Sequence, residues 1–292
     1  MTPPTPPRGP LPPAAPIASP RASPPGALRR LFGLRRMLVQ LVVRDVAGRY
    51  RGSFGGIAWS LITPVLMLAV YLFVFGVVFN PRQPAAGGAP PQDLAQFGLS
   101  LFCGILVHAM FAECLVRSPG VIVAQPSYVK KIVFPLELLP LVTVGSALFH
   151  LAVGVGVLLA GSVVLGAPPG PAVLALPLAL APLVLMCAGV AWLTASLGVF
   201  LRDIGQLTGL AATVMMFLSP VFYPVSALPA DWRWLAWASP ITFPIESVRG
   251  LLLRDALPDP AGLAGYWLLS LATCWLGWLW FDKTRRGFAD VL

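Results

Sequence analysis

Long runs of uncharged, mostly apolar residues alternate along the chain with short charged segments. The runs cover residues 57–79, 94–112, 138–201, 204–230 and 260–281, and the second continues to Val116 past the single charge of Glu113. A helix needs roughly 20 apolar residues to cross a bilayer. The run 138–201 is far too long for one crossing, and its segment GAPPGP at 166–171 divides it into two. The pattern therefore predicts an all-α integral membrane protein with six transmembrane helices.

Two different segments precede the first run. Residues 1–27 are rich in proline and poor in large apolar side chains, which predicts a disordered tail. Residues 28–52 predict a basic amphipathic helix that lies in the membrane interface, ahead of a transmembrane domain at 53–292. Its polar face would hold Arg29, Gly33, Arg36, Gln40 and Arg44, and its apolar face Leu31, Leu34, Leu38, Leu41 and Val42. A soluble core helix is the weaker alternative, because a spanning run follows at once.

The segment 228–260 fits neither a span nor a free loop. It is too charged to cross the bilayer, and its tryptophans Trp232, Trp234 and Trp237 suit the headgroup region. Ser-Pro at 239–240 and Phe-Pro at 243–244 would divide a helix into two short pieces. We expect a pair of interfacial or re-entrant helices here, between the fifth and sixth spans.

Composition and charge agree with a bilayer as the solvent. The chain is 57% hydrophobic and 11% charged, whereas an ordinary globular domain has about 25% charged residues. The net charge of +9 suits nucleic acid or anionic lipid, and lipid is favoured because the basic residues flank the apolar runs. With the N-terminus inside, 16 of the 20 Lys and Arg residues fall on the inner side. The distribution predicts that both termini are cytoplasmic.

Motifs for enzyme chemistry are absent from the sequence. No lysine follows a glycine, so there is no phosphate-binding Gly-Lys-Ser/Thr motif. His108 and His150 have no carboxylate or cysteine at metal-ligand spacing, and we expect satisfied or cavity-facing histidines. The four cysteines lack zinc-site or redox spacing. Glu113 and Glu137 are expected to cap helices or to pair with Arg117, Lys130 or Lys131, with a proton-coupling role as the less favoured alternative.

Two further features have both a functional and a structural explanation. The inner segment 117–140 is either an ordinary loop or a short helix on which a cytoplasmic partner docks. Aromatic side chains in or near the spans either line a passage, because sugar rings stack on aromatic faces, or pack against lipid and protein. The candidates for a substrate path are Trp59, Tyr71, Phe222 and Tyr223.

Four stretches resemble one known family. They are RDVAGRYRGSFGGIAW (44–59), YVKKIVFPLELLP (128–140), FLRDIGQ (200–206) and LSPVFYPVSALP (218–229). In this order, on six predicted spans, they resemble the membrane-spanning subunits of ABC-type polysaccharide exporters. The resemblance covers roughly residues 38–290. Two positions depart from the family pattern, since Ala47 stands where lysine is common and Ser239 where asparagine is common.

The resemblance implies a homodimer in a bacterial inner membrane that exports a lipid-linked polysaccharide such as O-antigen. A separate ATPase in two copies would hold ATP and Mg²⁺, so we expect no cofactor, catalytic residue or metal site in this chain, and no nucleic acid partner. A cytoplasmic collar would include Arg44, Arg49, Tyr50 and Arg51. The ATPase would dock on Val121, Ile122, Gln125, Tyr128, Lys130 and Lys131.

Other functions stay open at this point. A related exporter of drugs or lipids would share the architecture, although RYRGS and SPVFYP favour the polysaccharide branch. A membrane enzyme acting on lipid-linked sugars predicts paired carboxylates or histidines, which the spacing does not offer. A scaffold protein would not need the strongly basic inner side.

Overall fold

The computed structural model describes residues 32–74, 94–130 and 134–292, which fall into two units, Met1–Met37 and Leu38–Leu292. In the described part of the first unit, the Arg35 guanidinium lies 4.4 Å from the centre of the Phe32 ring. The predicted tail at 1–27, the first predicted span beyond residue 74, and Lys131 lie outside the described residues.

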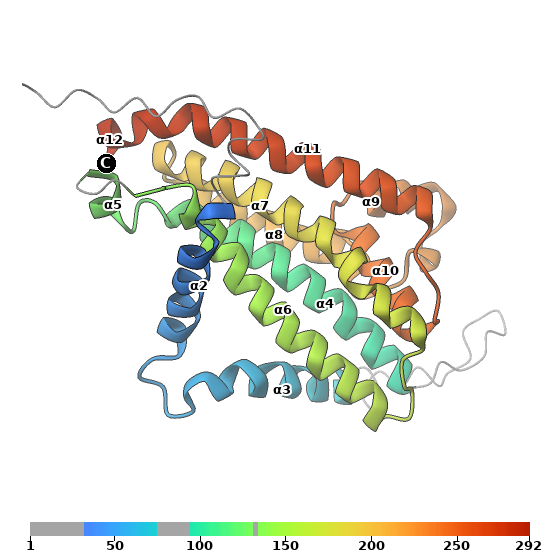
Figure 1. Ribbon diagram of the computed structural model, residues 1–292. Helices are drawn as coiled ribbons and strands as arrows, with labels where there is room; N and C mark the ends of the chain where they lie inside the picture. Colours follow the sequence, from blue (N-terminus) through green and yellow to red (C-terminus); the bar gives the residue numbers. More distant parts are fainter. Residues whose placement is uncertain (1–31, 75–93, 131–133) are drawn as a thin grey trace, which may run out of the picture. The chain divides into compact units, whose positions relative to one another are not determined.

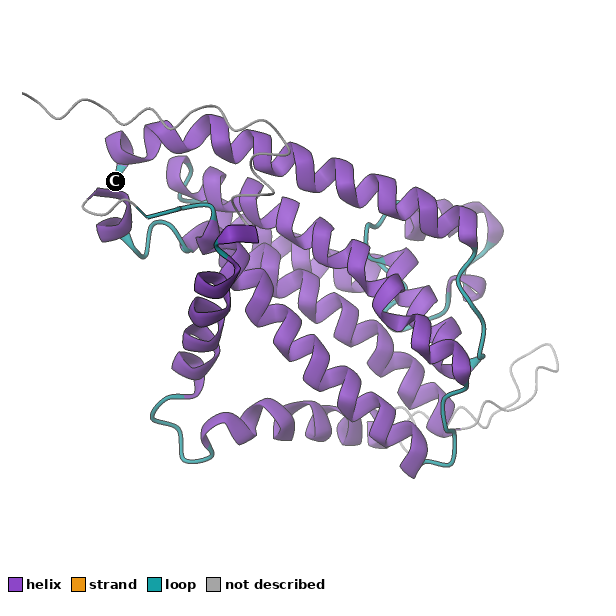
Figure 2. Ribbon diagram, viewed as in Figure 1, coloured by secondary structure: helices purple, strands orange, loops and turns teal. Residues whose placement is uncertain are grey.

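The regular structure of the described residues is helical, with no strand among them (Figure 2). The helices, labelled in Figure 1, are α2 (Arg35–Tyr50), α3 (Trp59–Phe73), α4 (Leu94–Arg117), α5 (Pro126–Lys130), α6 (Leu138–Val164), α7 (Leu176–Phe200), α8 (Ile204–Leu218), α9 (Arg233–Trp237), α10 (Thr242–Leu253), α11 (Pro260–Thr284) and α12 (Phe288–Val291).

Five helical segments in the described part of the chain are long and apolar enough to cross a membrane. They are Gly56–Phe73, Gln96–Gly120, Leu138–Val164, Pro171–Phe200 and Pro260–Val291. These segments match the first, second, third, fourth and sixth predicted spans. The prediction of an all-helical membrane protein is therefore confirmed, while the count of six crossings stays a prediction.

The fifth predicted span, 204–230, is helical over only about half its length. Helix α8 ends at Leu218, which makes it about 22 Å long at 1.5 Å per residue, short of a hydrocarbon core of about 30 Å. Ser219 and Pro220 follow at once, and the Tyr223 hydroxyl donates to the carbonyl oxygens of Phe217 and Leu218 at 3.1 and 3.0 Å. Proline and this cap end α8, so the helix covers only the first part of the predicted fifth span, whose crossing stays a prediction.

The breaks predicted at GAPPGP and at Ser-Pro 239–240 are confirmed, whereas the break predicted at Phe-Pro 243–244 was wrong, because both residues lie in the first turn of α10, where a proline is tolerated. The GAPPGP segment lies between α6 and α7, where Gly166 has a φ of +76° that favours glycine. Residues 228–260 hold two short helices, α9 and α10, separated at the Ser-Pro pair. Asp259 begins α11 by accepting a hydrogen bond from the Gly262 amide at 2.7 Å.

The core of the second unit lies among α4, α6, α7 and α11. Figure 1 shows α4, α6 and α7 side by side, and α11 packs along α7. The two helices approach closely at a pair of glycines, where a Cβ added to Gly277 would lie 2.1 Å from the Gly189 carbonyl oxygen. Helix α3 packs on α4 and α6, while α10 packs on α4 and α7. The ion pairs of Glu113 and Arg117 place α2 near the C-terminal end of α4, and the bond from Arg249 to the Ser100 carbonyl oxygen places α10 near its beginning.

Candidate functional site

A cluster of charged side chains joins α2, α4 and α6 at the predicted cytoplasmic end of the spans. Glu113 of α4 accepts hydrogen bonds from Arg117 at 2.9 Å and from Arg49 of α2. Its second carboxylate oxygen lies 3.0 Å from Nδ1 of His150 on α6. The Glu113 side chain is only 16% exposed, so its negative charge depends on these three partners. The predicted pairing of Glu113 with Arg117 is confirmed.

A second carboxylate extends the cluster along α2. Asp45 pairs with Arg117 at 3.0 Å and accepts a hydrogen bond from the Ser146 hydroxyl of α6 at 2.6 Å. Tyr50 lies 3.1 Å from Nε2 of His150. The His150 ring thus lies between the Glu113 carboxylate on its Nδ1 side and the Tyr50 hydroxyl on its Nε2 side, with Arg49 3.4 Å from Nδ1. Two arginines and two carboxylates thus form a balanced network, defined as the inner cluster: Asp45, Arg49, Glu113, Arg117, Ser146 and His150.

The local sequence explains how α2 reaches this cluster. Residues 38, 41, 42, 45 and 49 share one helix face at spacings of three and four. Val42 packs over Gly145 of α6, where an added Cβ would lie 2.4 Å from its methyl carbon. Val46 is buried, whereas Val39 and Val43 are more than half exposed. The protein-facing side of α2 therefore begins apolar and ends charged.

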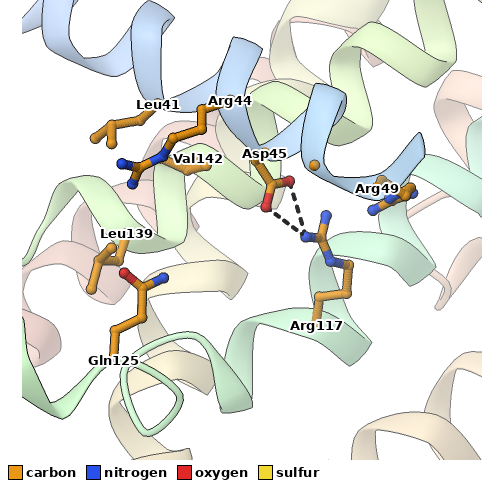
Figure 3. A pocket seen from close by; sticks show the side chains of 9 residues that line it. Leu41, Arg44, Asp45, Arg49, Arg117, Gln125, Leu139 and Val142 are labelled. Carbon is orange, nitrogen blue, oxygen red and sulfur yellow. Dashed lines mark hydrogen bonds and ion pairs between the residues drawn. The ribbon is translucent and has the colours of Figure 1, made fainter. Parts of the chain in front are cut away.

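The predicted collar and docking residues meet beside the inner cluster. The Arg44 guanidinium donates to the Tyr128 hydroxyl of α5 at 3.3 Å. A pocket of about 430 Å³ lies beside this contact and is lined by Arg44, Asp45, Arg117 and Gln125, among others. Figure 3 shows Arg44 and Gln125 on facing walls, with the Asp45–Arg117 pair beside them. Of the predicted collar, Arg44, Arg49 and Tyr50 make such contacts, and Arg51 is exposed.

The predicted docking residues have different environments. Ile122 has no exposed surface, so it anchors the segment. Val121, Gln125 and Tyr128 are partly exposed, and the Tyr128 ring stacks on Phe134 at 4.5 Å. The side chain of Lys130, like all of Lys131, lies outside the described residues.

A second inner contact involves the C-terminal helix. The buried carboxylate of Glu137 lies 3.4 Å from Arg285, which also pairs with Asp282 at 2.7 Å. Trp192 of α7 donates its indole N–H to the Glu137 carbonyl oxygen at 3.0 Å. His108 lies 3.0 Å from the Ala212 carbonyl oxygen, which confirms the expected satisfied histidine.

The candidate substrate-path residues lie in two separate places. Trp59 and Tyr71 belong to α3, where Trp59 is 42% exposed. Phe222 and Tyr223 follow α8 and line a pocket of about 260 Å³ with residues of α4 and α10, but with none of α3. The pocket therefore brings Phe222 and Tyr223 together, but neither Trp59 nor Tyr71 lines it.

A buried arginine, which the sequence analysis did not single out, holds the backbone around Phe222 and Tyr223. Arg249 of α10 is 3% exposed and donates to the carbonyl oxygens of Ser100, Val221 and Tyr223 at 3.0, 2.7 and 3.1 Å. Burial lowers the pKa of its guanidinium, and the Glu246 carboxylate 3.1 Å away acts in the opposite direction. The sequence did offer one signal for this role, because Arg249 stands among apolar residues in a segment predicted to lie on the outer side.

Comparison with known proteins agrees with this geometry. The ABC-2 type transporter family matches residues 37–253. The O-antigen export system permease protein RfbA of Myxococcus xanthus is 25% identical over 267 residues, which cover 91% of this chain and 98% of the relative. Two proteins of the same name from Klebsiella pneumoniae are each 24% identical over 257 residues, covering 88% of this chain and 95% of theirs. The family match extends from α2 through α10, and with five long apolar helices it indicates a multi-pass membrane protein. The chain belongs to the ABC-2 type transporter family.

Proposed function

We propose that the chain is the permease subunit of an ATP-driven exporter that moves a lipid-linked, O-antigen-like polysaccharide across the bacterial inner membrane. The observation that carries this proposal is the match over 98% of the length of a protein named as an O-antigen export permease. Hydrated sugars face a large desolvation cost across about 30 Å of hydrocarbon, so such a polymer needs a protein-lined path.

Membership of the ABC-2 type transporter family implies a membrane setting and a partner ATPase. The sequence lacks a phosphate-binding Gly-Lys-Ser/Thr motif, which supports the assignment of ATP and Mg²⁺ to that partner. We propose that two copies of this chain form a homodimer that binds two copies of the ATPase. This chain itself would hold no cofactor. The 16 inner basic residues favour cytoplasmic termini.

We infer that the ATPase docks on the segment around α5 and that the inner cluster transmits its motion. Tyr128 contacts Arg44, and the next residue, Asp45, pairs with Arg117. Arg117 shares Glu113 with Arg49 and His150. Polar contacts, joined by the step from Arg44 to Asp45 along α2, thus connect α5 to α2, α4 and α6. A shift of α5 would change contacts on all three helices, which carries the argument for coupling.

The fifth crossing combines α8 with the irregular residues that follow it. Backbone at membrane depth must be shielded by protein and have its polar groups satisfied. Arg249 supplies that by binding the Val221 and Tyr223 carbonyl oxygens. We place α9 and α10 at the outer interface and the residues of α2 at the inner one. The passage runs between two copies, with Trp59, Tyr71, Phe222 and Tyr223 as its candidate aromatic residues.

Deletion of the gene tests the function, with plasmid-borne wild type as the control. Loss of surface polysaccharide together with lipid-linked polymer accumulating inside is the expected result. Normal surface polymer contradicts the proposal, and loss without accumulation points to synthesis instead.

Docking is tested separately with Lys130→Glu and Lys131→Glu in one chain. We expect weaker co-purification of the ATPase, because the change reverses two charges beside α5. Arg233→Glu, on the predicted outer side, is the matched control. Unchanged co-purification of the double variant contradicts the docking surface.

A further inference from the structure

Phe222 and Tyr223 line a pocket that we name the outer pocket. It combines aromatic, charged and uncharged polar side chains. Its volume of about 260 Å³ would hold roughly nine waters at about 30 Å³ each, which is of the order of one monosaccharide. Its lining includes Gln96, Phe222, Tyr223, Ser226, Glu246 and Arg254. They come from the start of α4, the turn after α8, and α10 with Arg254, the residue that follows it.

Arg249 holds these three elements in fixed positions. Its guanidinium binds the Ser100 carbonyl of α4, the Val221 and Tyr223 carbonyls of the turn, and Glu246 of its own helix. A planar group with several fixed donors imposes one geometry on its acceptors. The pocket walls are therefore set before any ligand arrives, which lowers the entropic cost of binding.

The polar side of the pocket retains capacity for hydrogen bonds. One oxygen of Glu246 faces Arg249 at 3.1 Å, and the other lies 3.5 Å from Arg254, longer than a strong charged hydrogen bond of about 2.7–2.9 Å. Arg254 is 62% exposed at its side chain. Gln96 and Ser226 are exposed as well. A carboxylate, a guanidinium, an amide and a hydroxyl thus face one open space.

The apolar side of the pocket is aromatic and rigid. Phe222 is half-buried, and its ring packs at 5.8 Å against Phe217 of α8. Tyr223 is fixed by the bonds of its hydroxyl to the end of α8. An aromatic face beside bidentate polar groups suits a sugar ring, which has apolar C–H faces and hydroxyls at its rim. The Glu246 carboxylate already lies beside the two guanidinium groups of the lining, and a purely apolar ligand would leave the polar groups without partners.

We propose that the outer pocket binds a sugar residue of the polysaccharide as it leaves the membrane, with Phe222 stacking on the ring and Glu246 and Arg254 binding its hydroxyls. This inference rests on the proposed function. It assigns a ligand class to one pocket of each chain, whose residues Phe222 and Tyr223 are also candidates for the outer part of the proposed passage. Glu246 also holds Arg249, so the decisive variants are at Phe222 and Arg254.

Binding is measured first on the purified permease with its ATPase, by the change in tryptophan fluorescence on titration with oligosaccharides released by mild acid from the host's own surface polysaccharide. Phe222→Leu keeps apolar packing on Phe217 but removes the aromatic face. We expect a three- to tenfold weaker affinity, the range that an aromatic contact contributes. Phe222→Tyr should bind like wild type, and Arg254→Gln should weaken binding. Arg233→Gln, an exposed outer arginine outside the pocket lining, is the matched control.

The outcomes separate the pocket from the proposed function. Unchanged affinity in Phe222→Leu and Arg254→Gln overturns the pocket, and so does equal weakening in Phe222→Tyr and Phe222→Leu, because that indicates packing alone. The deletion strain reports on export independently. If it still displays surface polymer, the proposed function fails while the titration still decides whether the pocket binds sugar.

Discussion

Removal of the Glu113 carboxylate is the sharpest perturbation of the inner cluster. Glu113→Ala leaves Arg49 and His150 without their shared acceptor, whereas Arg117 keeps its pair with Asp45. Breaking a fully buried ion pair costs about 3–5 kcal/mol. Arg49 and Arg117 are 35% and 33% exposed, so water compensates in part, and exposed pairs contribute about 0.2–1 kcal/mol. We expect a loss of roughly 2–3 kcal/mol, between these limits.

A double-mutant cycle isolates the contact between α2 and α4. The free energy of unfolding in mixed detergent and dodecyl sulfate, followed by the fluorescence of the nine tryptophans, would be compared for wild type, Glu113→Ala, Arg49→Ala and the pair. We expect a coupling energy of about 1 kcal/mol, within the range for contacting residues. Arg51→Ala, two residues beyond Arg49 and exposed, should change stability by less than about 0.5 kcal/mol.

Additive effects of the two substitutions, within about 0.3 kcal/mol, would refute the reasoning. Helix α2 would then not be held on α4 by this ion pair, and the proposed path of coupling would lose its central contact.

Three other substitutions test other parts of the structure. Gly277→Ala should destabilise the chain by about 1–3 kcal/mol through overpacking, because the new Cβ would lie 2.1 Å from a carbonyl oxygen of α7. Gly265 on the same helix has open space around it, so Gly265→Ala should leave the free energy of unfolding unchanged in the same assay. Arg249→Met leaves three carbonyls and a carboxylate without their donor, so we expect a loss of about 3–5 kcal/mol and faster proteolysis of the turn after α8; equal proteolysis would contradict its anchoring role. Tyr128→Phe removes the hydrogen bond to Arg44, worth about 1 kcal/mol or roughly fivefold, and should raise the ATP hydrolysed per polymer delivered; an unchanged ratio contradicts coupling through α5.

The sequence predicted those features that depend on local pattern. Run length identified five long apolar helices, and the glycine and proline of GAPPGP located the turn between α6 and α7. The Ser-Pro pair at 239–240 identified the division between α9 and α10. The pairing of Glu113 with Arg117 was also accessible, because residues four apart face each other on a helix.

Features that depend on distant residues were not accessible in the same way. His150 lies 37 residues beyond Glu113, and Asp45 lies 72 residues before Arg117. Nothing local to either pair indicates the contact, which arises only when α2, α4 and α6 pack. The end of α8 was missed for a related reason, since an uncharged run does not show where the helix stops. The cap from Tyr223, five residues beyond the helix, completes that stop.

The most direct test of the central claim is transport in a defined system. The chain and its partner ATPase would be placed in proteoliposomes with lipid-linked polysaccharide on the ATPase side, and the polymer reaching the lumen would be measured by its protection from a glycan-cleaving enzyme. The account predicts protection that requires both chains and ATP, and that falls in Glu113→Ala at equal protein incorporation. Protection without ATP, or ATP hydrolysis without protected polymer, would contradict it.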